Sequence, residues 1–234
     1  MSENKIKTGS SYSPYSGQQE SCYIEGSSGL LYPGVKIENI SYPLTISAVQ
    51  AAVCSCLANG DTPETLYQPG VKSDLLKYWV DEFKLRVLNE QPASENPIYN
   101  PVSEISDNID TELQQLCDKA VTIHSDFPVS AILITEAGAI SGVNVEVSVW
   151  ALGLCAERVA LSRAISAGIT AFRFMHVYAP KSEFCSPCGA CRQVLNEFMP
   201  KSMVYLHHTA SAISKHFVEH LLPYGITSAS LKNK

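Results

Sequence analysis

The chain has 234 residues, of which 45% are hydrophobic, and its 17 basic and 23 acidic side chains give a formal net charge of −6. This length supports one large domain or two smaller ones, and no apolar run reaches the roughly 18 residues that a membrane-spanning helix needs. Proteins that follow a phosphate backbone normally carry an excess of Lys and Arg. The acidic balance therefore argues against a polynucleotide substrate and favours a small neutral one.

The N-terminal stretch, residues 1–17, is polar and rich in Ser and Tyr. It lacks the apolar centre of a signal peptide, so a cytoplasmic protein is expected. The chain contains eight Cys. In a protein that is not exported, cysteines serve as metal ligands or buried thiols rather than as a disulfide framework.

The first half of the chain is similar to the second at an offset of about 108 residues. The segment Gly34-Val35-Lys36-Ile37-Glu38 matches Gly142-Val143-Asn144-Val145-Glu146, and the tetrapeptide Val-Leu-Asn-Glu occurs at 87–90 and again at 194–197. Other matches are Tyr15-Ser16 with His124-Ser125, Leu44 with Leu152, Ser47 with Cys155, and Gly60 with Gly168. Agreement over this length predicts two copies of one domain.

Three prolines, Pro92, Pro97 and Pro101, lie between the two copies. Proline resists both helices and central strands, so residues 92–103 are predicted to form a linker. The predicted domains are therefore residues 1–91 and residues 104–234.

The second half alternates between helical and strand patterns. Helices are predicted at residues 105–122, 155–166 and 187–198, and strands at 129–135, 139–147 and 172–178. The alternation indicates an α/β fold in which helices cover a central sheet. It places Cys155 and Cys188 at the starts of two helices, where unpaired backbone N–H groups and the helix dipole stabilise thiolates.

The most informative motif is Cys155-Ala156-Glu157, followed by Pro187-Cys188-Gly189-Ala190-Cys191. Three thiolates provide three of the four tetrahedral ligands of zinc, and a catalytic zinc site leaves the fourth position to water. Glu157 lies two residues from the first ligand, where it can transfer protons. A Cys or His, a Glu two residues later and a Pro-Cys-x-x-Cys are together typical of zinc enzymes that deaminate nucleobases.

A closed structural zinc site, with Cys185 as the fourth ligand, is the alternative interpretation of these cysteines. This interpretation gives no role to Glu157, and burying a carboxylate that has no function costs stability. A catalytic zinc is therefore favoured.

The first half lacks the residues of the motif. Ser47 stands at the position of Cys155, Val49 at that of Glu157 and Gln50 at that of Arg158. At the same offset, the counterparts of Cys188 and Cys191 fall near Asp81 and Lys84. A site without thiolates or an acid–base group cannot hold a catalytic zinc, so the first half is predicted to be a non-catalytic copy with a structural role.

On these residues the chain resembles the zinc-dependent cytidine deaminase family. The resemblance covers about residues 118–225 and, more loosely, residues 12–90. The motifs that carry it in the second half are Asp126-Phe127-Pro128-Val129-Ser130-Ala131, the segments 142–146 and 155–158, and Pro187-Cys188-Gly189-Ala190-Cys191-Arg192-Gln193. The first half adds Tyr12-Ser13-Pro14-Tyr15-Ser16 and Ile37-Glu38-Asn39-Ile40-Ser41-Tyr42-Pro43-Leu44.

The resemblance implies a cytidine-deaminase-like three-layer fold, with a mixed central sheet covered by helices, present twice. It implies a hydrolase of pyrimidine salvage that converts cytidine and deoxycytidine to uridine and deoxyuridine with release of ammonia, by attack of zinc-bound hydroxide at C4. Cys155, Cys188 and Cys191 would bind one zinc per chain, in the C-terminal domain, at Zn–S distances of about 2.3 Å. Glu157 would take the proton of the water, protonate N3 and later protonate the leaving ammonia.

The resemblance also assigns residues that hold the substrate. Asn144 and Glu146 would bind the ribose hydroxyls, Phe127 would pack against the base, and Ala156 is implied as a further binding residue. Arg158 would offset the excess negative charge of three thiolates. The residues alone leave other roles open, because Asn144 and Glu146 suit a polar strand end, Phe127 a core position and Arg158 a surface position.

Two aromatic residues are implied to complete a site across an interface between domains. Tyr224 follows Leu221-Leu222-Pro223, as an aromatic does near the C-terminus of family members, and Tyr42 lies in Ser41-Tyr42-Pro43, for which the second half has residues 147–151 instead. Family members are homotetramers of single domains or dimers of a duplicated chain. A homodimer that binds a nucleoside, and neither nucleic acid nor a membrane, is therefore expected.

Two alternative functions stay open at this point. The chain could deaminate another cytosine nucleoside, such as a nucleoside antibiotic, and residues 147–151 are where such a difference would be found. It could also be a non-enzymatic protein that keeps zinc for structure. The six His residues are assigned no catalytic role, because three Cys already supply the zinc ligands.

Overall fold

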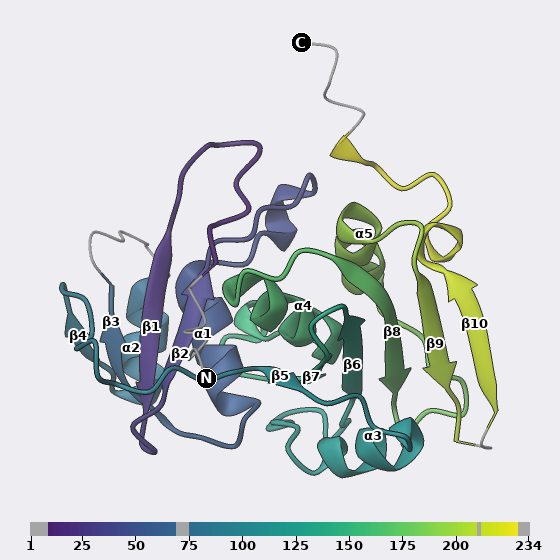
Figure 1. Ribbon diagram of the computed structural model, residues 1–234, viewed down its shortest axis with the longest axis horizontal. Helices are drawn as coiled ribbons and strands as arrows, with labels where there is room; N and C mark the ends of the chain where they lie inside the picture. Colours follow the sequence, from purple (N-terminus) through teal and green to yellow (C-terminus); the bar gives the residue numbers. More distant parts are fainter. Residues whose placement is uncertain (1–8, 69–74, 210–211, 229–234) are drawn as a thin grey trace.

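The computed structural model describes residues 9–68, 75–209 and 212–228 of the chain. Two β-sheets lie side by side, each accompanied by helices, and the first half of the sequence builds one and the second half the other (Figure 1). Across these three described stretches, the helices are all too short or too polar to cross a membrane.

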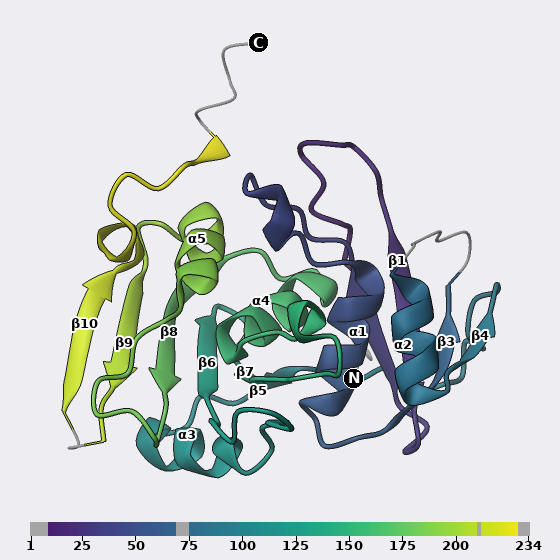
Figure 2. The same ribbon diagram turned by 180° about the vertical axis from the view of Figure 1, so that it is seen from behind.

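The second half forms a mixed six-stranded sheet in the order β10-β9-β8-β6-β7-β5, in which β8 and β9 are parallel and the other neighbours antiparallel. Helix α3 lies on one face of this sheet, and α4 and α5 lie on the other (Figures 1 and 2). The strands are β5 (Val102–Ser103), β6 (Ser130–Thr135), β7 (Ala139–Val143), β8 (Phe172–Tyr178), β9 (Met203–His207) and β10 (Ile213–Phe217), and the helices are α3 (Ile109–Cys117), α4 (Ala156–Ser166) and α5 (Gly189–Phe198).

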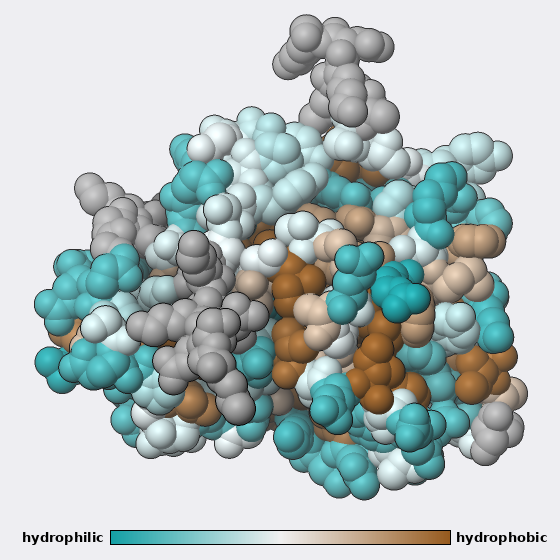
Figure 3. Space-filling view, in the orientation of Figure 1, coloured by the Kyte–Doolittle hydropathy of each residue, from teal (hydrophilic) through white to brown (hydrophobic). Residues whose placement is uncertain are grey.

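Alternation along β6 explains the three layers. Successive side chains of a strand point to opposite faces of the sheet. Ile132 and Ile134 therefore pack with Leu113 of α3 on one face, while Ala131 and Leu133 join the larger core on the other. All these side chains are buried, so the middle of β6, residues 131–134, is apolar on both sides, as expected for a strand covered on both faces. Figure 3 shows apolar residues gathered near the middle of the molecule on the α3 side, over the second sheet, with polar residues around them.

The first half repeats this arrangement with four strands in the order β2-β1-β3-β4, which matches β7-β6-β8-β9 strand for strand. In its described residues no helix precedes β1, so the counterpart of α3 is missing there and both helices lie on one face (Figure 2). The elements are β1 (Ser21–Gly26), β2 (Leu31–Val35), α1 (Ala48–Leu57), β3 (Pro63–Tyr67), α2 (Leu76–Phe83) and β4 (Arg86–Leu88). The predicted fold class is confirmed.

Most predicted elements of the second half are found, and two are shorter than expected. The helix predicted at 105–122 spans only Ile109–Cys117, because Asn108 caps its start and Val121 leaves the helix to pair with Val145. The strand predicted at 139–147 ends at Val143, because the Asn144 side chain then bonds to neighbouring backbone.

The predicted linker is in contact with both sheets. Leu31 of the first sheet exchanges hydrogen bonds with Pro97 and Tyr99, and Val102 and Ser103 form an edge strand on β7 of the second sheet. The domain boundaries at 91 and 104 remain a prediction.

One sequence match between the halves is wrong. Val87 and Leu88 lie in strand β4, whereas the identical tetrapeptide at 194–197 lies in helix α5. Strand pairing instead makes Leu88 the counterpart of Tyr205, because Leu88 is opposite Tyr67 and Tyr205 is opposite His176 in equivalent strands. Four residues do not determine a conformation by themselves, and the surrounding sheet decides between strand and helix.

The proposed counterparts of the Cys-x-x-Cys residues are therefore also wrong. Helices α2 and α5 both end in Glu-Phe, at Glu82-Phe83 and Glu197-Phe198. The two Glu residues also make equivalent hydrogen bonds to the opposite half. Glu82 accepts the backbone N–H of Ser148, and Glu197 accepts the backbone N–H of Ile40, which matches Ser148 at the offset of about 108 residues. Aligned on these helix ends, Cys191 corresponds to Leu76 rather than Lys84, and the counterpart of Cys188 falls at position 73, outside the described residues.

Helices α1 and α4 pack together between the two sheets and join the halves (Figure 1). Arg163 of α4 is buried there, donating to the hydroxyl and carbonyl oxygens of Ser55 and to the carbonyl of Ser141. Its guanidinium also lies over the ring of Tyr99, 5.3 Å from the centroid. A buried cation with this set of acceptors ties the two halves to each other.

A methyl group at Gly142 is expected to destabilise the protein. A Cβ there would lie 2.5 Å from the backbone nitrogen of Ala160 and overlap the backbone oxygen of Ala156, because β7 packs directly on α4. Gly142→Ala should lower the free energy of unfolding by about 1–3 kcal/mol and the thermal midpoint by several degrees. Gly189→Ala is the control, since a Cβ at Gly189 meets nothing within 4 Å. A Gly142→Ala midpoint equal to that of the control would contradict this account of the packing.

Candidate metal centre and pocket

Three cysteine side chains converge at the starts of α4 and α5. Cys155 precedes the first turn of α4, Cys188 precedes that of α5, and Cys191 lies within the first turn of α5. The sulfur of Cys188 is 3.7 Å from that of Cys155 and 3.6 Å from that of Cys191, and all three lie within 4.8 Å of one another. Two sulfurs bound tetrahedrally to one zinc at about 2.3 Å would lie about 3.8 Å apart, so the donor set fits zinc.

Electrostatics also favour a cation at this point. Hydrogen bonding with the thiols of Cys155 and Cys191 holds the pKa of Cys188 well below its usual range, and backbone N–H groups add to the effect. The same contacts raise the pKa values of Cys155 and Cys191, because three sulfurs cannot all carry negative charge side by side. A dication among them would remove that conflict and allow all three to bind as thiolates.

Cys185 does not belong to this cluster. Its thiol is buried and faces the carbonyl oxygen of Val177, and its backbone N–H donates to His208. Among the residues that the structure describes, the group of converging metal-binding side chains consists of Cys155, Cys188 and Cys191 alone. The cluster therefore provides three ligands and leaves a fourth tetrahedral position to a non-protein ligand, as catalytic zinc sites do.

Glu157 lies beside the cysteines and lines the same pocket as Cys155 and Cys188. It is only 3% exposed, and burial raises its pKa to about 7. A carboxyl group with a pKa near neutrality can both accept and release a proton under ordinary conditions.

The pocket has a volume of about 340 Å³ and combines polar and aromatic walls. Asn144, Glu146 and Phe127, which were predicted from the sequence, line it together with Cys155, Glu157 and Cys188. The remaining lining residues were not predicted: Ser125, Val129, Trp150, Val177, Ala179, Ser182, Phe184, Cys185 and Ser186. Trp150 occupies the position in the second half that matches Tyr42 in the first. This match is the one sequence signal that could have identified Trp150 as a pocket residue.

Asn144 and Glu146 are held in fixed orientations by the chain itself. The amide oxygen of Asn144 accepts the backbone N–H of Val129, and its amide nitrogen donates to the carbonyl of Phe127. Glu146 accepts the backbone N–H groups of His124 and Ser125 and the Ser125 hydroxyl. Burial alone would raise the pKa of Glu146, but these hydrogen bonds outweigh it and lower the pKa, so the carboxylate stays ionised.

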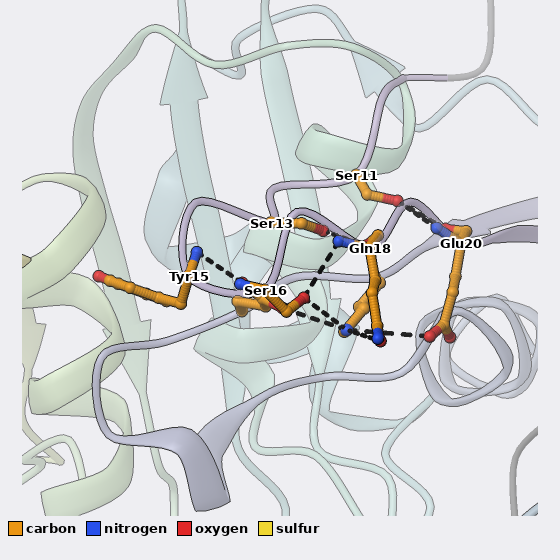
Figure 4. A network of polar contacts seen from close by, with 8 residues as sticks. Ser11, Ser13, Tyr15, Ser16, Gln18 and Glu20 are labelled. Atoms are coloured by element: carbon orange, nitrogen blue, oxygen red, sulfur yellow. Dashed lines mark hydrogen bonds and ion pairs between the residues drawn. The ribbon is translucent and has the colours of Figure 1, made fainter.

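The first half has the same hydrogen bonds around the carboxylate that matches Glu146, but it lacks the Asn that lines the pocket in the second half. Glu38, the counterpart of Glu146, accepts from the backbone of Tyr15 and Ser16 and from the Ser16 hydroxyl. Lys36 stands where the second half has Asn144, and its ammonium lies 3.1 Å from Glu38. Figure 4 shows the loop that carries Ser16, whose hydroxyl also accepts the backbone N–H of Gln18. An ion pair thus takes the place of the side chains that face the pocket in the second half.

Replacing Glu38 should change how stability depends on pH. Burial would raise the pKa of Glu38, but hydrogen bonds from Ser16 and Tyr15, and from Lys36, lower it to about 2. Because the pKa is lowered on folding, its contribution is present in full above the unfolded value of about 4.3 and is lost as the pH falls towards 2. E38Q should be less stable than the original chain by about 1–3 kcal/mol at pH 6, measured by urea unfolding. That difference should narrow at pH 3.5, and a constant difference would show that the charge is not responsible.

Five predicted site residues do not line the pocket, and one of them, Cys191, is buried within the thiol cluster. Ala156 is fully buried at the start of α4, and Arg158 points to the first half, where it donates to the carbonyl of Leu44 at 3.3 Å. The Nε atom of Arg158 is buried without a hydrogen-bond partner. Tyr42 is 83% exposed, and Tyr224, with a positive φ of 59°, is fully exposed. Within one chain neither tyrosine is part of the pocket wall.

Comparison with known proteins finds deaminases that are similar to about half of the chain. The family model "Cytidine and deoxycytidylate deaminase zinc-binding region" matches residues 106–207. The cytidine deaminase of Sporosarcina psychrophila is 39% identical over 122 residues, which are 51% of this chain and 90% of that protein. Blasticidin-S deaminase of Bacillus cereus is 28% identical over 132 residues, 50% of this chain and 92% of that protein. The crystal structure of a cytidine deaminase from Burkholderia pseudomallei covers 50% of this chain and 94% of its own, at 32% identity and a TM-score of 0.47.

The match to the Sporosarcina protein extends over nearly its whole length, and the zinc-binding region of the family model includes all three clustered cysteines and Glu157. The chain therefore belongs to the zinc-dependent cytidine deaminase family.

Proposed function

We propose that this chain hydrolyses cytidine and deoxycytidine to uridine and deoxyuridine, releasing the 4-amino group as ammonia. The observation that carries the proposal is that three thiols converge and that two of them, those of Cys155 and Cys188, line one pocket together with a buried carboxyl, Glu157. The same pocket is lined by Asn144, Glu146 and Phe127. The pocket thus combines a metal centre, a proton carrier and groups suited to a sugar and a base.

Cys155, Cys188 and Cys191 would hold one zinc ion per chain. When bound, zinc would activate a water molecule for attack at C4 of the cytosine ring. Glu157 would accept a proton from that water and pass it to N3, and would afterwards move the proton of the hydroxyl added at C4 to the departing amino group. Its raised pKa supports this role, because the carboxyl must exchange protons twice in each cycle.

Asn144 and Glu146 would orient the sugar, and Phe127 would pack against the base. Their fixed hydrogen bonds to neighbouring backbone leave acceptor capacity on Glu146 and one amide hydrogen on Asn144, which suits the hydroxyl groups of a ribose. Arg158 remains a proposed source of positive charge near the thiolates, and Ala156 a proposed binding residue through its backbone.

A neutral nucleoside fits the pocket better than a nucleotide. The described lining residues include two carboxyl groups, those of Glu146 and Glu157, and no Lys or Arg. Lys181, next to lining residue Ser182, is paired with Asp126 at 2.6 Å. A phosphate group would therefore meet negative charge without a free cation from these walls.

The first half, residues 1–91, is proposed to be a non-catalytic copy, with residues 92–103 as the connection and residues 104–234 as the catalytic domain. The equal strand order of the two sheets supports two copies, and the first has Ser47 and Val49 where the second has Cys155 and Glu157. A homodimer with two active sites, in the cytoplasm, is the assembly and location we infer from the duplication and the sequence.

The proposal is tested by measuring zinc content and ammonia release in the same preparation, with cytidine, deoxycytidine, their 5′-monophosphates and blasticidin S as substrates. Close to one zinc per chain and turnover of the two nucleosides would support it. Preference for the monophosphates would contradict the neutral-substrate assignment. Turnover of blasticidin S alone would establish the antibiotic alternative, and zinc without any turnover would establish a structural metal.

Tyr42→Ala is expected to weaken cytidine binding if Tyr42 reaches the pocket of a second copy. Its ring is exposed in one chain, and an aromatic contact with a ligand contributes about 1 kcal/mol or more, which corresponds to roughly a fivefold increase in KM. Light scattering would show in parallel whether the variant still dimerises. Unchanged KM in a dimeric Tyr42→Ala protein would exclude Tyr42 from the site.

A further inference from the structure

The pocket has one wall that is held in place by the non-catalytic half. Trp150, in a short 3₁₀ helix at Trp150–Leu152, lines the pocket and is 66% exposed. Its ring packs on His124, with the centroids 5.6 Å apart, and the backbone N–H of His124 donates to Glu146. Trp150 therefore stands at the Glu146 end of the pocket.

Both ends of the segment that carries Trp150 are bonded to the first half. At its start, Glu82 of α2 accepts the backbone N–H and the hydroxyl of Ser148, each at 2.8 Å. At its end, the buried side chain of Gln50 donates to the carbonyl of Leu152 at 2.9 Å. Each oxygen of the Glu82 carboxylate accepts a different donor of Ser148, so the two hydrogen bonds together fix the position of Ser148 closely.

We propose that Trp150 contacts the nucleoside and determines its affinity, and that Glu82 of the non-catalytic half is the positioning residue that sets Trp150 against the pocket. This inference rests on the proposed function, since it names a further residue of the same site. An indole face at the Glu146 end would cover the apolar face of the sugar or base, and the exposed ring loses contact with water when a ligand is bound. The non-catalytic half would thus have a direct part in substrate binding.

The contact predicts an effect on KM with little effect on kcat, because Trp150 stands at the Glu146 end of the pocket and has no part in the proposed proton transfers. Trp150→Ala should raise KM for cytidine about tenfold and change kcat by less than about threefold. Trp150→Phe keeps an aromatic face and should stay within about threefold of the original KM.

Glu82→Ala should raise KM several-fold in the original chain and produce no further rise in a Trp150→Ala chain, because it acts through Trp150. Asp81→Ala is the matched control. It removes one negative charge from the neighbouring position of the same helix, whose backbone carbonyl accepts a hydrogen bond from the Lys84 ammonium. KM in this control should equal that of the original chain.

Tryptophan fluorescence provides a second measurement that does not depend on turnover. The chain has two Trp, and Trp79 is 1% exposed, so a change on adding the product uridine would come from Trp150. Uridine should quench the original protein and leave Trp150→Phe unchanged.

The outcomes separate this inference from the proposed function. If Trp150→Ala left KM unchanged, the inference would be overturned even though the original chain deaminates cytidine. The same holds if Glu82→Ala raised KM by the same factor in the original chain and in the Trp150→Ala chain. If the chain turned over no nucleoside, the proposed function would be overturned. The contact would still be supported if uridine quenched the fluorescence of the original protein and did not quench that of Trp150→Phe. Absence of quenching in the original protein would overturn the contact.

Discussion

Glu157→Gln is expected to keep close to one zinc per chain and to lower kcat for cytidine about a thousandfold. Proton transfer by a positioned side chain contributes roughly 10²- to 10⁴-fold to a rate, and Gln has nearly the same shape but cannot exchange the proton. The carboxyl of Glu157 is buried in the pocket with a pKa of about 7, so it is the group placed to perform both transfers.

The measurement is ammonia release together with elemental analysis of zinc on the same protein. Glu112→Gln is the matched control, because Glu112 on α3 is a second carboxyl whose pKa is raised by burial, and it lies outside the pocket. This control should keep full activity. If Glu157→Gln retained more than about a tenth of the turnover with zinc present, Glu157 would not be the proton carrier.

Cys188→Ser is expected to lose most of the zinc, and with it all measurable deamination, without loss of helix α5. Cys188 is the residue that caps this helix, and its sulfur accepts the backbone N–H of Cys191 at 3.5 Å. Ser is among the best residues at such a position, so the substitution removes the thiolate and preserves the cap. The first half shows this arrangement at Ser47, whose hydroxyl accepts the backbone N–H of Gln50 at the start of α1.

Loss of residues that only orient metal ligands costs about 10- to 100-fold in metal affinity, so loss of a ligand should cost at least a hundredfold. Competition with a chelator would measure this, with circular dichroism to check the helix. Cys185→Ser is the control, because Cys185 lies three residues away and outside the cluster. Equal zinc affinity in the two variants would mean that Cys188 is not a ligand.

The chemistry of the site was predictable because its residues are close in sequence to helix starts. A helix start places the side chains of Cys155 and Glu157, or of Cys188 and Cys191, within a few residues of one another, and such short spacings are readable directly. Asn144 and Glu146 were accessible through the family motif, and both line the pocket.

Register beyond β3 was not predictable in the same way. A constant offset of about 108 residues holds from β1 to β3, but the second half has more residues between β8 and the end of α5 than the first has between β3 and the end of α2, so the offset grows there. The identical tetrapeptides at 87–90 and 194–197 hid that change, since one is strand and the other helix. Only strand pairing and the ends of α2 and α5 show the true correspondence.

What local sequence settles here is therefore the α/β alternation, the duplicated pattern, and the presence of three thiols that could hold a metal ion beside a carboxyl group. What required the tertiary structure is the shape of the pocket around that centre. Trp150 is placed by Glu82 and Gln50, which are 66 and 102 residues away from the groups they bond. Such contacts depend on how two packed halves meet, and no spacing along the chain encodes them.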